Sequence, residues 1–549
     1  PVPAAPAPAN LVPKPAGPPA APKPEPDERS KEEQLTAANA RASGIPYYDT
    51  RDLDHAENVT DQIDLDVLRQ YQIAPLHRYN QKSIEFGLTG QTDRSLLPGL
   101  QSQLPGVQLT FKTISRTGYN WILNHIYYQM FQEERDGNFE MFGQKLSEQP
   151  PKRAFQYIAQ LAFWLDASDI HIEPQSELAR IRFRMDGVLH PITIVSLQSY
   201  KIFLSDLQTR AEIKWGSDTP QSGRISYNLM SHQATIVTIN MRIETIPAFH
   251  GEEIVVRLFN NEVRTLQLDY LGFTPVQTER LNAVVSHPNG MVLTVGPTGS
   301  GKTSTLYALI NQLNSPEVKI ITLEDPVEYD LPGISQISVH TEDKESFAER
   351  LRAVMREDPN VVMIGEIRDI DTAKTALQAA LTGHLVLSTF HATNAAAAIS
   401  RMMDMIGTNP LFASAIRLII AQRLARRICT HCSEEIAPTP KQAVFIAEIL
   451  ESIPENRRPH LVKDFKLHHG KGCAFCHGLG YRGRIAIVEM MSITPDIEQL
   501  MTSVNKTTTR DLQELAVRNG MVTLTEDGLH KVLEGVTTID EIMGLAIDL

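Results

Sequence analysis

Two groups of residues in this 549-residue chain have the types and the spacing for chemistry. The first is the segment 296–303, which reads GPTGSGKT and matches the pattern G-x-x-x-x-G-K-T. Glycines in such a loop let successive backbone N–H groups turn towards one anion. Lys302 can then reach the β- and γ-phosphates, and the Thr303 hydroxyl can ligate Mg²⁺. The pattern predicts a binding loop for a nucleoside triphosphate, with ATP and Mg²⁺ as cofactors.

The residues around this loop predict the elements that it needs. The segment 291–295, apolar except for Thr294, indicates a buried strand, and an apolar repeat from Lys302 onward indicates a helix. That helix presents its unpaired N–H groups and the positive end of its dipole to the same point. A glycine turn that only joins strand to helix is the alternative. The residues expected to contact the nucleotide are Gly296, Pro297, Thr298, Gly299, Ser300, Gly301, Lys302, Thr303 and Ser304.

Three further apolar segments, 319–329, 361–369 and 384–395, predict strands that carry acidic or histidine side chains near their ends. Open α/β sheets bind ligands outside the carboxyl ends of their strands. These side chains are therefore candidates for the same site as the loop. The candidates are Glu324, Asp325, Glu328, Glu366, His384 and His391, together with Lys302.

Phosphoryl transfer requires charge neutralisation, a bound Mg²⁺ and a water oriented in line with the leaving group. Glu366 stands where a P-loop ATPase keeps the group that positions or deprotonates that water; a solvated surface glutamate is the alternative. Gly365 stands where an Mg²⁺-holding aspartate is often found. We therefore expect the water shell of the metal to be held by Glu324, Asp325 or Glu328.

Histidine and arginine side chains near these segments have two interpretations each. A structural hydrogen bond is the default role for His384 and His391, and sensing of the γ-phosphate by one of them is the alternative. Arg352 and Arg356 lie one turn apart on a predicted helix. They fit either a solvated helix face or a contact with acids or phosphates of a neighbouring subunit.

The second group consists of four cysteines in two C-x-x-C pairs, separated by 40 residues: Cys429, Cys432, Cys473 and Cys476. Two tightly spaced pairs predict a structural Cys₄ zinc site, and four free thiols are the alternative. The second pair is followed by a histidine, which also matches the C-x-x-C-H pattern of haem attachment, although no export signal accompanies it. The histidines that can substitute as ligands are His431, His468, His469 and His477.

Composition limits the class of protein. The formal net charge of −13 argues against nucleic-acid binding as the main function. We find no apolar run long enough to cross a bilayer and no leader, so we expect a cytoplasmic protein that meets a membrane only through partners.

The length implies several domains, and their boundaries follow from changes in pattern. Eleven prolines among the first 26 residues indicate a disordered Pro/Ala-rich tether. The expected divisions are the tether (1–44), a small α/β domain (45–131), a linker (132–151), a second, sheet-containing domain (152–261), and a nucleotide domain (262–549) that includes the cysteine segment (429–476) and C-terminal helices (490–549).

Together these residues resemble the secretion-superfamily ATPases of the type II secretion and type IV pilus assembly class. The resemblance covers about 45–549 and is most specific from Ser168 onward. The segments that carry it, in the order of the family, are SDIHIEP, RFRMDGVL, QSGRI, GPTGSGKTSTLY, ITLEDPVEY, GEIRD, TGHLVLSTFHATNA, AQRLARRIC, the two C-x-x-C pairs, YRGRIAIVEM and GMVTLTEDGLHKVLEGVTTIDE.

The resemblance implies an α/β fold with a RecA-like P-loop ATPase domain, preceded by a PAS-like α/β domain and a small N-terminal α/β domain, and with a Cys₄ zinc subdomain. It implies a homo-hexameric motor at the inner face of the bacterial inner membrane. ATP hydrolysis would move an inner-membrane platform protein that adds pilin subunits. The N-terminal domain is similar to the partner-docking module of the family, so a cytoplasmic docking protein is a further expected partner.

The resemblance also implies roles for individual residues. The Walker A loop of the family corresponds to 296–303, its aspartate box to 324–328, its catalytic Walker B glutamate to Glu366, and its histidine box to His384 and His391. Its phosphate-contacting arginines from the preceding domain correspond to Arg224 and Arg242, although this chain has QSGRI where the family more often has QDGR. Arg352 and Arg356 match helix arginines at the subunit boundary.

Hypotheses of different classes remain. The first is a Mg-ATP-hydrolysing motor of pilus or pseudopilus assembly or of a related secretion system. The second is an ATP-binding regulatory scaffold with little turnover, for which Gly365 leaves room. Nucleic-acid translocation is a third, which would require strongly salt-dependent binding and is disfavoured by the acidic charge balance.

Overall fold

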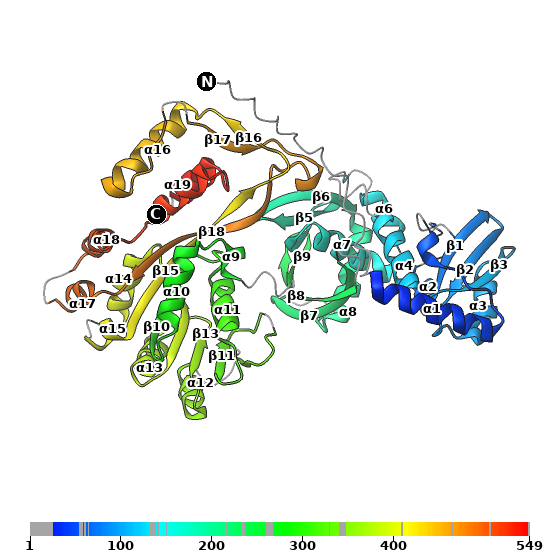
Figure 1. Cartoon of the computed structure of the whole chain (residues 1–549), viewed down its shortest axis with the longest axis horizontal. Helices are drawn as coiled ribbons and strands as arrows, with labels where there is room; N and C mark the ends of the chain where they lie inside the picture. Colours follow the sequence, from blue (N-terminus) through cyan, green and yellow to red (C-terminus); the bar gives the residue numbers. More distant parts are fainter. Residues whose placement is uncertain are drawn as a thin grey trace, which may run out of the picture. The chain divides into compact units, whose positions relative to one another are not determined.

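The computed structural model describes residues 26–53, 57, 59, 62–63, 65–130, 139, 142–149, 151–214, 218–231, 236–259, 267–328, 330–339, 347–407, 410–462, 465–503 and 507–546. The chain divides into two compact units. One comprises Pro1–Phe183 and Pro191–Leu258, and the other comprises Arg184–His190 and Phe259–Leu549 (Figure 1). Among the described residues, none of the helices combines the length and the apolar character that a bilayer span requires.

The first unit begins with a small α/β body built on a three-stranded sheet of order β1-β2-β3. β1 and β2 are antiparallel, and β2 and β3 are parallel. Its elements are α1 (Pro26–Ser43), α2 (Leu65–Tyr71), β1 (Ile73–Asn80), β2 (Ser83–Leu88), α3 (Leu97–Gln103), β3 (Gln108–Thr113) and α4 (Arg116–Met130).

Helix α1 corrects only the last part of the predicted tether of 1–44, because Pro26–Ser43 is helical and contacts this body. Glu33 of α1 is buried and accepts hydrogen bonds from the hydroxyls of Tyr47 (2.6 Å), Thr50 (2.9 Å) and Ser115 (2.8 Å). Burying a carboxylate is costly unless donors satisfy it, and three hydroxyls do so here. The proline-rich start that motivated the prediction, 1–25, lies outside the described residues.

The second part of this unit contains a six-stranded sheet of order β6-β5-β4-β9-β8-β7. The predicted linker of 132–151 is corrected in part, because α6 lies within it and its Phe142 is buried and stacks on Tyr157 of α7 at a centroid distance of 5.2 Å. The elements are α6 (Phe142–Glu148), α7 (Pro151–Trp164), β4 (Ala167–Pro174), β5 (Leu178–Met185), β6 (Val188–Ser196), α8 (Leu197–Arg210), β7 (Gln221–Met230), β8 (Ile236–Ala248) and β9 (Gly251–Phe259).

The second unit is built on a seven-stranded sheet of order β12-β11-β13-β14-β10-β15-β18. All neighbouring strands are parallel except β15 and β18. The strands are β10 (Gly290–Val295), β11 (Ile320–Glu324), β12 (Ser335–Ser338), β13 (Val361–Ile364), β14 (Leu385–Phe390), β15 (Ile416–Ile428) and β18 (Tyr481–Ser492). β18 therefore extends past residue 490, where the sequence predicted helices.

Helices cover both faces of this sheet, which explains the continuous apolar runs of its strands. Val292 of β10 packs in one core with the helices between residues 268 and 313. Met291 and Leu293 of the same strand pack in a second core with the helices from residue 347 onward. The helices are α9 (Leu268–Leu271), α10 (Pro275–Val285), α11 (Lys302–Leu313), α12 (Phe347–Val354), α13 (Ile370–Leu381), α14 (Ala395–Ile406), α15 (Pro410–Ala415), α16 (Pro440–Ser452), α17 (Pro495–Thr502), α18 (Thr509–Arg518), α19 (Leu524–Leu533) and α20 (Ile539–Ala546). A two-stranded sheet of β16 (Ser433–Ile436) and β17 (Leu467–Gly470) accompanies the cysteines.

Candidate active site

The glycine-rich loop joins the carboxyl end of β10 to the first residue of α11, which is Lys302. The Lys302 ammonium donates to the backbone carbonyl groups of Gly296 (3.1 Å) and Pro297 (2.9 Å). Burial lowers the pKa of Lys302 and the neighbouring Glu366 opposes this shift. The predicted strand–loop–helix order is thus present, with the lysine lying over the carbonyl groups of its own loop and Thr303 half-buried beside it.

Gly301 shows why this loop tolerates no side chain at its last position. It caps α11 with a φ of +84°, in the left-handed region that glycine adopts without strain. A Cβ atom there would lie 2.7 Å from the side-chain nitrogen of Gln422 on β15. Gln422 is buried and its amide oxygen accepts from the Thr305 hydroxyl of α11 at 2.7 Å. β15 therefore contacts the loop and the start of α11 through Gln422.

Glu366 lies just past β13 and is the centre of a group of polar side chains. Its Oε1 is 2.6 Å from Nε2 of His391, which follows β14 directly. Its Oε2 accepts from Nε of Arg368 at 2.9 Å, and Arg368 is also 3.6 Å from the Asp325 carboxylate. The carboxyl ends of β10, β11, β13 and β14 thus bring the loop lysine, two acids and one histidine to one edge of the sheet.

The predicted acids of the 324–328 segment differ in availability. Glu324 is buried, and its carboxylate accepts hydrogen bonds from the Tyr307 hydroxyl, the Thr322 hydroxyl (2.5 Å) and Gln336 (3.2 Å). Three donors give Glu324 a structural role in anchoring β11 to α11. Asp325 is half-buried and Glu328 is exposed, so both can reach a hydrated cation.

Gly365 has a packing reason, although the sequence reasoning considered it only as a missing aspartate. Its N–H donates to the Leu323 carbonyl at 2.7 Å, and its carbonyl accepts from the Thr389 hydroxyl at 2.6 Å. A Cβ atom there would lie 3.3 Å from the Leu323 carbonyl oxygen and 3.4 Å from Cα of Glu324. β11 therefore approaches too closely for a side chain at residue 365 without local movement.

The two histidines of the predicted pair lie at opposite ends of β14. His391 follows the strand and contacts Glu366, as described above. His384 precedes the strand, and its ring Nδ1 is 3.1 Å from the Ala379 carbonyl while its own carbonyl accepts from Gly290. Since Gly290 begins β10, His384 lies at the edge of the sheet opposite to the loop. The structure does not bring His384 to the site.

The predicted arginines belong to elements other than those that carry this group. Arg224 of β7 and Arg242 of β8 are direct cross-strand partners in the first unit, and Arg242 also contacts Glu244 at 2.5 Å. In the second unit, Arg352 lies on α12, and Arg356 donates to the Arg352 carbonyl at 3.1 Å. Arg224, Arg352 and Arg356 are exposed.

The four cysteines form one cluster although 40 residues separate the pairs. All four Sγ atoms lie within 4.8 Å of one another, and three Sγ–Sγ distances are 3.8 Å. A tetrahedron with Zn–S bonds of about 2.3 Å has edges of about 3.8 Å, whereas a disulfide would bring two sulfurs to about 2.0 Å. The arrangement therefore fits a Cys₄ zinc site and leaves no role for His431, His468, His469 or His477 as ligands.

Burial raises the pKa of the Cys429 thiol to about 12. Burial acts in the same sense on Cys476, but N–H groups of Cys473 and Gly480, each 3.2 Å from its sulfur, reverse the shift and lower the pKa. N–H donors aimed at a sulfur are typical of a sulfur that carries thiolate charge.

A second group of possible ligands lies in the first unit. The ligand atoms of His171, Glu173 and Glu253 are within 4.8 Å of one another. The Glu173 carboxylate, however, accepts from both Arg180 (2.8 Å) and Arg182. Two guanidinium groups already neutralise this cluster, so we assign no metal to it.

Arg368 is a site residue that the sequence reasoning missed. It stands two residues after Glu366 in the quoted GEIRD segment. Residues i and i+2 of an extended segment point to the same side, so the spacing itself was the available signal. Gln422 and Tyr307 were also missed, because their roles depend on tertiary contacts from other elements.

The parallel sheet, the loop between β10 and α11, and the acid beyond β13 define a P-loop nucleoside triphosphatase. A family model described as "Type II/IV secretion system protein" matches residues 144–544. The chain belongs to this family, which confirms the predicted resemblance, the α/β fold class and the assignment to the ATPases.

Known relatives agree with this assignment. The chain is 37% identical over 406 residues to the type IV pilus assembly ATPase PilB of Thermus thermophilus, with 74% of this chain but only 44% of that protein covered. It is 37% identical over 379 residues to the type II secretion system ATPase E of Vibrio cholerae, with 69% and 71% covered. The structure of the Legionella pneumophila ATPase DotB is similar in fold, with a TM-score of 0.54 at 18% identity over 72% of this chain and 95% of that one.

Proposed function

We propose that the chain is the subunit of a homo-hexameric motor that hydrolyses Mg-ATP and drives type IV pilus or pseudopilus assembly, or type II-like secretion. The contact of Glu366 with His391 and Arg368 beside the phosphate loop carries this proposal. A carboxylate fixed from two sides can orient a water without reorganising during the reaction. The names of the relatives, which include both a pilus assembly ATPase and a secretion ATPase, support the proposed process.

In the proposed reaction, the triphosphate lies along residues 296–301 and against the N-terminus of α11. The Lys302 ammonium exchanges the carbonyl groups of Gly296 and Pro297 for phosphate oxygens. Glu366 orients the attacking water, and His391 and Arg368 hold Glu366 in place. Mg²⁺ would neutralise phosphate charge, and the residues that fit it are Thr303 through its hydroxyl and Asp325 or Glu328 through its water shell.

The motor itself requires more than one chain. Arg224 and Arg242 are like charges directly opposed across β7 and β8, and Glu244 at 2.5 Å from Arg242 offsets only one of them, so a further anion would stabilise the pair. We propose that this pair meets nucleotide phosphates, and that Arg352 and Arg356 lie at a subunit boundary. The platform protein of the inner membrane and a cytoplasmic protein at the N-terminal domain are the proposed partners. The proposed location is the cytoplasmic side of that membrane, with no direct nucleic-acid contact.

Nucleotide binding tests the first requirement of this proposal. We expect Lys302→Ala to weaken binding of a fluorescent ATP analogue by about tenfold or more, because the loop loses its charged contact with the phosphates. Lys319→Ala is the matched control, since Lys319 is exposed, pairs with Glu357 and precedes β11 at the opposite edge of the sheet. Equal affinities for the wild type and both variants in a titration with Mg²⁺ would contradict the proposed binding site.

The histidine pair gives a second prediction. His391→Ala should lower the ATP turnover number by about tenfold or more, because Glu366 loses one of the two groups that hold it. His384→Ala should leave turnover within about twofold, because its ring bonds only to the end of α13. Steady-state ATPase assays on both variants show which of the two histidines supports turnover. A larger loss from His384→Ala would reverse the assignment.

A further inference from the structure

Glu489 is a buried carboxyl group that the proposed reaction does not use. It lies on β18 opposite Ala421 of β15, and only 1% of it is exposed. Its Oε1 accepts from the N–H of Ala395 at 2.9 Å, and its Oε2 accepts at 3.4 Å from the N–H of Leu524 and from the Gln513 side chain. Ala395 begins α14 and Leu524 begins α19, so one carboxyl group joins the N-terminal ends of two helices.

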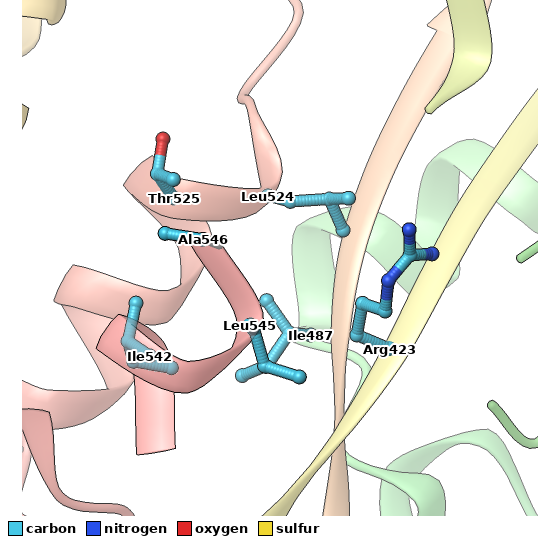
Figure 2. A pocket seen from close by; sticks show the side chains of 7 residues that line it. All are labelled: Arg423, Ile487, Leu524, Thr525, Ile542, Leu545 and Ala546. Atoms are coloured by element: carbon cyan, nitrogen blue, oxygen red, sulfur yellow. The ribbon is translucent and has the colours of Figure 1, made fainter. Parts of the chain in front are cut away.

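Arg423 of β15 is the second buried charge in this region, with 4% exposed. Its guanidinium donates to the Thr393 carbonyl at 2.7 Å and to the Gln422 carbonyl at 3.1 Å. Burial raises the pKa of the Glu489 carboxyl, and the positive charge of Arg423 opposes the shift, after the three hydrogen-bond donors. Arg423 also lines a pocket with side chains of β18, α19 and α20: Ile487, Leu524, Thr525, Ile542, Leu545 and Ala546 (Figure 2).

These two residues hold the short segment 391–395 that connects β14 to α14. His391 begins the segment, with its side chain on Glu366 and its carbonyl accepting from Arg401 at 2.8 Å. Two residues later Arg423 fixes the Thr393 carbonyl, and two residues after that Glu489 fixes the Ala395 N–H. All other hydrogen bonds given above for Glu489 lead to the helices α18 and α19.

We propose that Glu489 and Arg423 are positioning residues that place His391 against Glu366 and tie it to the C-terminal helices α18–α20. This inference rests on the proposed hydrolysis at Glu366. Burying a carboxyl group costs stability even where donors satisfy it, so an apolar residue would serve better if β18 needed only packing at this position. The N-terminal ends of two helices, with their unpaired N–H groups, explain why an acid is used.

A double-mutant cycle separates this role from a general loss of stability. Glu489→Ala should lower kcat by about tenfold or more, with KM for ATP within about twofold, because misplaced catalytic groups cost turnover rather than ground-state binding. Glu489→Gln retains an oxygen acceptor for Ala395 and should recover most of the turnover, and it remains informative if Glu489→Ala folds poorly. In the double variant with His391→Ala, kcat should fall no further than in the worse single variant.

Glu526 provides the matched control. Like Glu489, it is a buried carboxyl group whose pKa is raised by burial. It lies on α19, however, and pairs with Arg457 at 3.1 Å. Glu526→Ala should lower Tm without lowering kcat beyond about twofold at a temperature where the variant is folded. In the double variant with His391→Ala, the fold-reduction in kcat should equal the product of the two single-variant reductions. If kcat of the double variant Glu489→Ala with His391→Ala fell by the product of the two single reductions, the proposal would be overturned.

Hydrogen exchange gives a readout that does not depend on activity. In Glu489→Ala, peptides that cover 391–395 should exchange faster than in the wild type, whereas in Glu526→Ala they should not. If the wild type itself shows no ATP turnover, the proposed function fails, but this comparison still decides the structural part of the inference. Unchanged exchange at 391–395 in Glu489→Ala would overturn it.

Discussion

Replacing Glu366 with glutamine is expected to lower the ATP turnover number by about 100-fold or more while nucleotide binding is retained. The amide cannot accept a proton, and it no longer matches the donors that hold the carboxylate, Nε2 of His391 at 2.6 Å and Nε of Arg368 at 2.9 Å. Lys302 and the loop remain unchanged, so the affinity for ATP should stay within a few-fold. The variant should therefore separate binding from hydrolysis.

A matched glutamate sharpens this experiment. Glu357 lies at the end of a 3-10 helix after α12, is exposed and pairs with Lys319, so Glu357→Gln changes the same functional group away from the site. Steady-state turnover of the three proteins, with and without the membrane platform protein, gives the answer. Equal, near-zero rates for the wild type and Glu366→Gln would favour the ATP-binding scaffold over the motor.

Loss of the metal is expected to have the largest effect on stability. Purified chain should contain one zinc per molecule, and both chelation and Cys432→Ser should lower Tm by about 10 °C or more. The reason is that four sulfurs with neighbours at 3.8 Å converge from two loops, and three of the four cysteines are buried in this cluster. Without the ion, the buried thiols become protonated and lose the contacts that join the loops.

His469→Ala is the control for this zinc prediction. His469 lies on β17, is exposed and was one of the histidines that the spacing left open as a ligand. Its variant should retain full zinc content and thermal stability. Metal analysis and thermal melts on both variants are sufficient. Less than one zinc per chain in the wild type, with four thiols that react freely, would exclude the Cys₄ site.

A local sequence pattern can predict those residues whose roles depend on their neighbours in the sequence. The loop 296–303, the apolar strands and the paired cysteines belong to this class, since spacing alone fixes their geometry. Arg368 belongs to it as well, but its role was overlooked. The site residues Gln422, Glu489 and Arg423 do not, because the partners that define their roles lie on other elements at sequence separations of 24 to 117 residues.

Two expectations from the sequence depended on contacts that lie outside the local pattern. The tether of 1–44 was predicted from composition, but Glu33 finds three hydroxyl donors on residues that follow α1, one of them 82 residues away. For His384 and His391, which flank one apolar run, the sequence left open a structural hydrogen bond or a γ-phosphate contact by one of them. The six-residue strand between them spans about 20 Å of backbone, so the two histidines lie at opposite edges of the sheet.

β15 has a consequence for how the molecule can transmit movement. Gln422 of this strand backs Gly301 of the phosphate loop, and Cys429 follows the strand directly. Seven residues of extended backbone span about 23 Å, and β15 is paired along its length with β18. Pairing of this kind stiffens a strand, so we expect movement at the cysteine cluster to reach the phosphate loop along β15. The candidate sites for zinc and for the triphosphate thus lie at the two ends of one stretch of β15.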